Sequence, residues 1–140
     1  MRMLRVLTLV ALVLVVILIF GKGPKQRAPH YNAETEVRAE GVIQEVREYW
    51  CPINSDQGTH LMLKTDAGIP ELHVAPVRFL QGNNISFGKG DQIAAIGSAV
   101  VYQGQNALIV RQITRGDQTF AFRQSDGRPL WVEPRRAYVK

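Results

Sequence analysis

The sequence predicts an all-β domain, a small barrel with one short helix, that follows an N-terminal transmembrane helix. Short apolar-alternating segments recur about every ten residues, and no long amphipathic helix interrupts them. Clusters of Gly, Asn, Asp and Ser stand between these segments and predict turns. The first 20 residues, by contrast, include 17 apolar ones. A chain of 140 residues leaves room for one domain after such a helix.

The N-terminal segment, residues 1–21, is predicted to be a membrane anchor. Its apolar run Val6–Phe20 is broken only by Thr8 and would rise roughly 22 Å as a helix. Arg5 and Lys22 flank the run and can reach the headgroups of a bilayer whose core is about 30 Å thick. The alternative is a cleaved signal peptide, but prolines follow the candidate cleavage sites.

Topology and tether follow from the residues around this run. Basic residues lie on both sides, so the charge rule gives no direction. Because a short N-terminal tail normally stays in the cytoplasm, we expect a single-pass inner (cytoplasmic) membrane protein with a periplasmic C-terminal domain. Residues 22–33 carry Gly, Pro and charges without apolar periodicity and predict an extended linker.

The first half of the domain predicts three strands. Apolar spacing in Glu36–Tyr49 indicates a long strand with a bulge near Gly41. A loop follows at Asn54–Gly58, because these residue types favour turns. Thr59–Thr65 alternates cleanly, and a turn then leads into its hairpin partner, Ile69–Val74.

The second half begins with a helix. Pro76–Gln81 predicts one or two helical turns, since Pro is favoured at a helix start. Three further strands are expected at Gln92–Tyr102, which Gly97 interrupts, at Asn106–Ile113 and at Thr119–Arg123.

This order of elements narrows the fold class. A long bent strand, a hairpin, a short helix and further strands are the plan of the OB-fold. We therefore predict an OB-fold-like barrel of five to six strands over residues 34–133, with a basic tail over 134–140.

A resemblance supports this prediction. Gly90-Asp91-Gln92-Ile93, Gly97-Ser98 and Gly104 with Ala107–Arg111 resemble the fourth and fifth strands of small bacterial OB-fold-like domains. The stretch Phe122–Trp131 resembles the "LRD..G.P.W" ending of uncharacterised exported proteins of that kind, with Phe122 in place of Leu and Gln124 in place of Asp. The resemblance covers about residues 36–131 and implies a fold, not an activity.

The net charge of +5 is unevenly distributed. Residues 1–27 hold five basic residues and no acidic one, so residues 28–140 carry 12 of each and are formally neutral. Within them, residues 28–75 carry −5 and residues 76–140 carry +5. The sequence therefore predicts an acidic first half and a basic patch, formed by Arg111, Arg115, Arg123, Arg128, Arg135 and Arg136.

Two histidines are the candidate metal ligands. Alternation places Leu61 and Leu63 inward, and hence His60 and His73 outward on neighbouring strands of one hairpin. Two imidazoles so placed can bind a transition metal, with Cys51, Asp66 or Glu71 as further ligands. The alternative is that both histidines are solvated on a strand face. We favour it over a metal site, because the spacing of the histidines matches no metal motif. Cys51 is expected to be a small buried residue at a strand end, or else to pair between molecules.

No catalytic motif is recognisable, so we expect a non-enzymatic protein without a cofactor. Tyr102 and Trp131 are candidate surface aromatics, and with Arg111 and Arg123 they form the tentative ligand-binding set. The favoured function is a membrane-tethered extracytoplasmic binding or adaptor module for a protein or glycan. The alternatives are a nucleic-acid-binding OB domain and a metal or redox accessory protein using His60 and His73.

Overall fold

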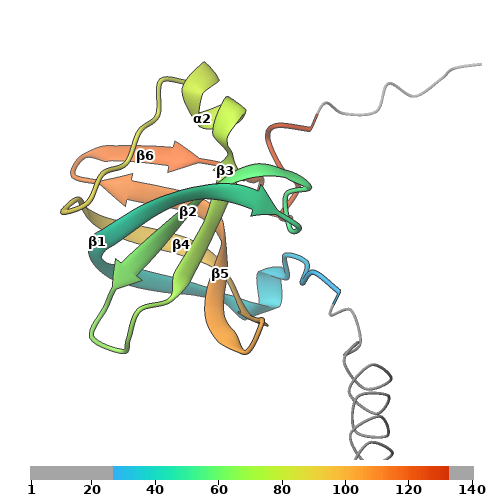
Figure 1. The fold of residues 1–140 in the computed structure, drawn as a ribbon, viewed down its shortest axis with the longest axis horizontal. Helices are drawn as coiled ribbons and strands as arrows, with labels where there is room; N and C mark the ends of the chain where they lie inside the picture. The colour runs from blue at the N-terminus through green and yellow to red at the C-terminus, as the bar shows by residue number, and fades with distance from the viewer. Residues whose placement is uncertain (1–26, 133–140) are drawn as a thin grey trace, which may run out of the picture.

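The computed structural model describes residues 27–132 (Figure 1). The predicted anchor, the first part of the linker (residues 22–26) and the basic tail lie outside this range. The elements in chain order are η1 (Ala33–Thr35), β1 (Glu36–Cys51), β2 (Asp56–Lys64), β3 (Glu71–Pro76), α2 (Val77–Gly82), β4 (Gln92–Tyr102), β5 (Gln105–Arg115) and β6 (Gln118–Ala121). No helix in the described part of the chain is long and apolar enough to cross a membrane.

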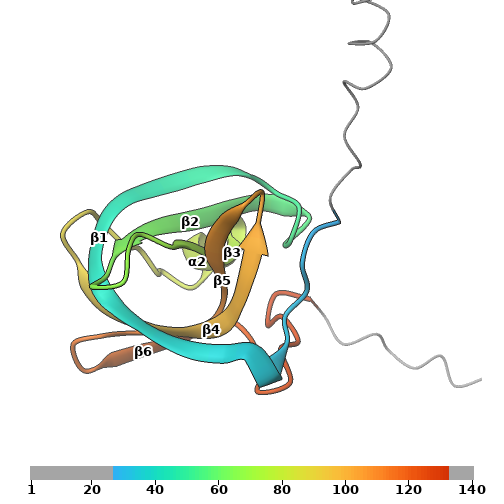
Figure 2. The ribbon, with the colours of Figure 1, turned by 90° about the horizontal axis from the view of Figure 1, so that it is seen from below.

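The strands form one closed barrel. Their order is β3-β2-β1-β4-β5-β6, and a parallel pairing of β3 with β5 closes the sheet. Seen along the barrel, β1 to β5 surround the interior and α2 lies across the far end (Figure 2). A helix between the third and fourth strands of a five-stranded barrel is the OB plan. The predicted all-β barrel is thus confirmed, with β6 as an extra strand paired to β5.

The barrel interior follows the predicted alternation. Leu61 and Leu63 of β2 and Leu72 and Val74 of β3 are completely buried in one core. Phe122, just after β6, is the largest side chain in that core. Burying each such side chain contributes about 1.5–3 kcal/mol relative to leaving it exposed.

Two strand glycines allow close approach between strands. A Cβ atom at Gly41 would collide with the carbonyl oxygen of Lys64, and one at Gly97 would lie 2.5 Å from the carbonyl oxygen of Ile109. The predicted bulge near Gly41 is displaced, because the register of β1 against β2 shifts between Ile43 and Glu45. Gly41 is therefore required by packing, while β1 bends two to four residues later.

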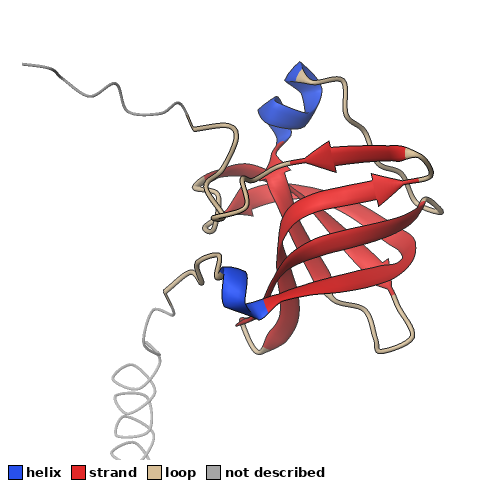
Figure 3. Cartoon of the chain, turned by 180° about the vertical axis from the view of Figure 1, so that it is seen from behind, coloured by secondary structure: helices blue, strands red, loops and turns tan. Residues whose placement is uncertain are grey.

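The strand bounds also differ from prediction at the β1–β2 turn. The predicted loop Asn54–Gly58 is half strand, since Asp56 pairs with Cys51 and Gly58 with Tyr49. Pairing along the end of β1 overrides the turn preference of these residues. Both chain ends of the described part lie on the side of the barrel where this turn is found (Figure 3). There Trp131 packs against Phe79 of α2 with ring centroids 5.7 Å apart.

Candidate metal centre

Three potential ligands meet at the end of β1 and the adjoining parts of β2 and β3. His60 and His73 are directly opposite each other in the β2–β3 pairing. Cys51 closes β1, where it pairs with the first residue of β2. Pairing between consecutive strands therefore brings together residues that lie up to 22 positions apart in the chain.

The two histidines lie on the outer face of the sheet, as predicted, but they are not solvated. Leu61 and Leu72, which alternate with them, point into the core, so the imidazoles point the other way. Nevertheless His60, His73 and Cys51 are each 0% exposed. The favoured interpretation of solvated histidines is wrong, whereas the buried strand-end position of Cys51 is confirmed. Such burial also leaves no accessible sulfur for the intermolecular disulfide considered above.

Two tyrosines cover the imidazoles. Tyr49 of β1 stacks on His60 with ring centroids 3.8 Å apart and an angle of 8° between the planes. Tyr102, at the end of β4, meets His73 edge-on at 5.7 Å. The hydroxyl of Tyr49 donates a hydrogen bond to the carboxylate of Glu71, which fixes the covering ring. Sequence reasoning missed this role of Tyr49, although its pairing position one strand away from His60 is a usable signal.

The separations of the ligand atoms suit a shared ion. Sγ of Cys51 lies 3.4 Å from Nδ1 of His73, and one ligand atom from each of the three residues falls within 4.8 Å of the others. Thiolate and imidazole ligands on one zinc-sized ion are separated by about 3.5–3.8 Å. The ligand atoms therefore need to move only slightly closer together to share one ion. Within residues 27–132 no other group of three His, Cys, Asp or Glu side chains meets this condition.

Most ring nitrogens in the cluster lack a hydrogen-bond partner. In the described part of the protein, both nitrogens of His60 and Nε2 of His73 are buried without a partner at good hydrogen-bond geometry, although the backbone of Gly58 and Arg47 lies close enough to His60 to oppose the fall in its pKa. A buried polar atom without a partner costs about 1–3 kcal/mol. Since native proteins rarely leave several such atoms together, the cluster has the character of a binding site.

Burial also sets the protonation of the three groups. It lowers the pKa of His60 to about 3, and the neighbouring His73 acts in the same direction. The pKa of His73 is lowered by burial as well, and Glu71 opposes this shift. Burial raises the pKa of the Cys51 thiol, while the backbone amides of Asn54 and Ile53 oppose that change. The imidazoles are therefore neutral, as metal ligands must be, and the amides are placed to stabilise a thiolate.

Space between Cys51 and His60 depends on a glycine. A Cβ atom at Gly58 would lie 2.7 Å from Cβ of Cys51, 3.1 Å from Cε1 of His60 and 3.5 Å from Nδ2 of Asn54. Any other residue there would push the two ligands apart.

Arg123 forms the other border of the cluster. Its guanidinium is buried between the rings of Trp131 and Tyr31, at 4.9 and 5.9 Å from their centroids. It donates to the side-chain oxygen of Asn54 at 3.2 Å and to the carbonyl of Gly127 at 3.0 Å. Burial lowers its pKa to about 10, which leaves it a cation at neutral pH. This arginine has no carboxylate partner among the ion pairs of residues 27–132.

The residues of the tentative ligand-binding set fall in three places. Tyr102 borders the candidate metal centre, Arg123 and Trp131 contact each other, and Arg111 forms a two-pronged ion pair with Glu36. Three of the four described arginines of the predicted basic patch are ion-paired, because Arg115 pairs with Asp91 and Arg128 with Asp126 as well. Arg135 and Arg136 lie outside the described residues. Neither Asp66 nor Glu71 joins the ligand group.

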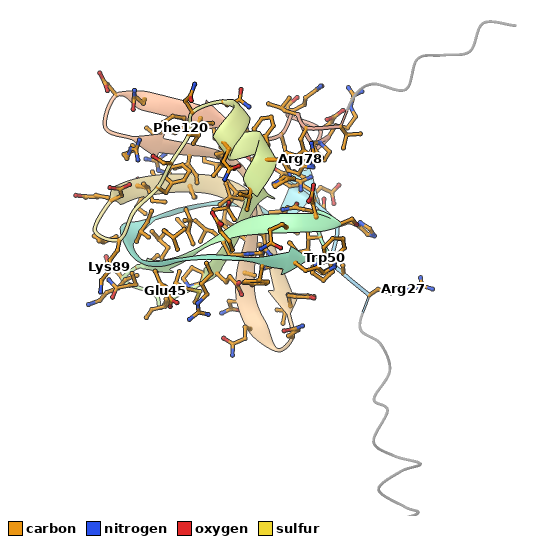
Figure 4. The ribbon with its side chains drawn as sticks, turned by 45° about the horizontal axis from the view of Figure 1, so that its top comes forward. Arg27, Glu45, Trp50, Arg78, Lys89 and Phe120 are labelled. Carbon is orange, nitrogen blue, oxygen red and sulfur yellow. The ribbon has the colours of Figure 1, made fainter. Side chains whose placement is uncertain are left out.

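An open groove of about 750 Å³ lies apart from these residues. The β2–β3 turn (residues 65–70), the β4–β5 turn (residues 104–106) and the start of β1 line it. Its charged residues from β1, Arg38 and Glu40, pair with each other. At the other end of β1, Trp50 projects from the barrel and is 63% exposed (Figure 4).

Fold and site together define the class of protein: a small closed β-barrel that carries a buried thiol–imidazole cluster on its outer face. Residues 35–120 match the model of the MamS/MamX magnetosome protein family. Because this match spans more than half of the chain, the protein belongs to that family. The predicted likeness to uncharacterised exported OB-fold proteins is compatible with this assignment only in its fold.

Solved structures with a similar fold are distant. Asparaginyl-tRNA synthetase from Pyrococcus horikoshii, complexed with asparaginyl-adenylate, is 13% identical with a TM-score of 0.46; the match covers 70% of this chain and 24% of that one. The OBody AM1L10 bound to hen egg-white lysozyme is 10% identical with a TM-score of 0.45, covering 69% of this chain and 99% of that one. No curated protein matched the sequence.

Proposed function

We propose that this domain is a non-enzymatic metal-binding module, which holds a transition-metal ion through Cys51, His60 and His73. The observation that carries this proposal is the approach of three completely buried ligand side chains to within 4.8 Å. A bound ion would take one nitrogen from each imidazole, so that up to two of the three unpartnered nitrogens would gain an interaction. The chain belongs to the MamS/MamX magnetosome protein family, and metal binding is the role that we propose for the barrel of this chain.

Retention of metal by the full chain tests the proposal. The wild-type protein is loaded with Zn²⁺ or with copper, dialysed against buffer and analysed for bound metal. We expect about one ion per chain, and at least a tenfold loss of affinity in Cys51→Ser, His60→Ala and His73→Ala. The third histidine, His30, lies in the exposed N-terminal segment and provides the matched control. His30→Ala should retain the ion, and equal loss in all four variants would refute the assignment.

We also propose that the barrel is tethered to a membrane with its domain on the extracytoplasmic side. The apolar run Val6–Phe20 supports this proposal. A full chain with Leu14→Arg and Ile17→Arg should leave the membrane fraction, whereas wild type remains there after a salt wash. Wild type that is washed off by salt would contradict the tether.

The adaptor role with a protein or glycan stays a prediction. The nucleic-acid alternative is weakened by the ion pairs of Arg111, Arg115 and Arg128.

A further inference from the structure

We propose that the Cys51–His60–His73 centre selects monovalent copper, Cu(I), over Zn²⁺ and binds it with three ligands. This inference rests on the proposed function, because it specifies the ion for the same site. Binding releases the thiol proton of Cys51 to solvent, so that one Cu–S bond replaces one S–H bond and no electron is transferred.

The number of ligands is the first argument. Three side chains offer ligand atoms here, and within residues 27–132 no fourth His, Cys, Asp or Glu joins them. Zn²⁺ almost always takes four ligands in proteins, either four from the chain or three with water in an open position. Trigonal sets of one thiolate and two imidazoles are instead an arrangement that copper adopts.

The covering of the site is the second argument. All three ligand side chains are 0% exposed, so bulk water does not contact them. Tyr49 lies flat on one face of the His60 ring, and the edge of His73 meets that ring at 4.7 Å. Tyr102 packs edge-on against the ring of His73. An ion that needs a bound water is therefore at a disadvantage, while a three-coordinate ion is not.

Charge is the third argument. A thiolate and two neutral imidazoles make a neutral complex with a monovalent ion, but leave one positive charge with a divalent ion. A net charge in a buried site is costly unless it is paired. The carboxylate of Glu71, which accepts the hydroxyl of Tyr49, offsets part of this charge, but it is not one of the ligands. The buried Arg123 cation, held by Asn54 beside Cys51 and Gly58, adds repulsion rather than compensation.

Ligand softness agrees with this selection. Thiolate and imidazole each bind both metals, but Cu(I) is a softer ion than Zn²⁺ and gains more from a sulfur ligand. Replacing the sulfur by oxygen should therefore affect the two ions differently. Cys51→Ser keeps the size and the two imidazoles but removes the soft ligand.

A competition experiment on the full chain tests the inference. The protein is offered equal concentrations of Cu(I), kept reduced in an anaerobic buffer by a chromogenic chelator, and Zn²⁺ held by a zinc indicator. We expect the protein to retain Cu(I) and leave Zn²⁺ with its indicator. Cys51→Ser should lose Cu(I) affinity by at least tenfold more than it loses Zn²⁺ affinity. X-ray absorption of the copper form should give three neighbours, one sulfur and two nitrogens.

The outcomes separate the two proposals. Retention of Zn²⁺ in preference to Cu(I), or a four-coordinate copper, would overturn the selection of copper while leaving metal binding intact. Failure to bind either ion, or binding that His60→Ala does not weaken, would overturn the proposed function itself. His30→Ala again serves as the control, because it changes a histidine outside the site.

Discussion

Acidification should destabilise the metal-free barrel in a pH range where its carboxylates remain charged. His60 is completely buried, and its pKa falls from 6.5 to about 3. The unfolded chain therefore binds a proton below pH 6.5 that the folded protein excludes, and stability is lost as the pH falls through 6.5. Between pH 7.5 and pH 5.5 this one group lowers the free energy of unfolding by about 1.4 kcal/mol. His73 adds a loss of the same sign.

Urea denaturation with a chelator present measures this effect at the two pH values. The midpoint should fall by at least about 0.5 M, since the urea dependence of a small domain is about 1–3 kcal/mol per M. Glu36 and Asp91 do not interfere, because their arginine partners and hydrogen bonds keep the pKa of each carboxyl below its usual value. Their stabilising contribution is lost only at still lower pH.

The matched variant for this experiment is His60→Phe. Phenylalanine can keep the stacking on Tyr49 and cannot take up a proton, so the variant should lose about 1.4 kcal/mol less than wild type over the same range. His30→Ala should behave as wild type. An unchanged pH dependence in His60→Phe would refute the reasoning. If that variant does not fold, the NMR signals of the His60 ring in wild type must stay constant from pH 7.5 to 5.5.

Three further predictions concern packing and access. Gly58→Ala should lower the stability measured by urea denaturation by about 1–3 kcal/mol. Gly82→Ala should cost nothing, because no atom lies within 4 Å of the added Cβ. Equal costs would contradict the close packing beside the site. The buried thiol of Cys51 should react with a thiol reagent slowly in native buffer and rapidly in urea, and fast native reaction would contradict its burial. Glu36→Gln should lower the stability by about 1–2 kcal/mol in thermal denaturation, because the Glu36 side chain is only 22% exposed in its ion pair. Glu40→Gln should cost close to nothing, because Glu40 is 63% exposed in its pair. Similar losses in both variants would contradict this difference.

The fold was largely predictable because its elements have local signals. Alternation at Leu61 and Leu63, the helix-starting Pro76 and the break at Gly97 each indicated a feature that the structure contains. The residue types of 56–58 predicted a loop, but these residues are in β2. Their pairing with the end of β1 is a tertiary effect that local sequence preference does not reveal. The bulge between Ile43 and Glu45 likewise has no glycine at its position that would indicate it in the sequence.

The site was only half predictable. Alternation gave the correct direction of His60 and His73, and their pairing across the hairpin is confirmed. Alternation cannot show what covers an outer face, and the covering tyrosine of β4 lies far along the chain from both histidines. The burial of Arg123 was hidden for the same reason, because its partners come from both ends of the domain.

The pairing of three consecutive strands has a consequence for how such a centre is inherited. All three proposed ligands lie within one continuous stretch, with His73 only 22 residues after Cys51. A single segment can therefore carry the complete ligand set, while Tyr102 of β4 contributes to the cover from outside it. Under the proposed metal binding, one substitution in this stretch would be enough to remove a ligand, and the barrel itself would not have to change.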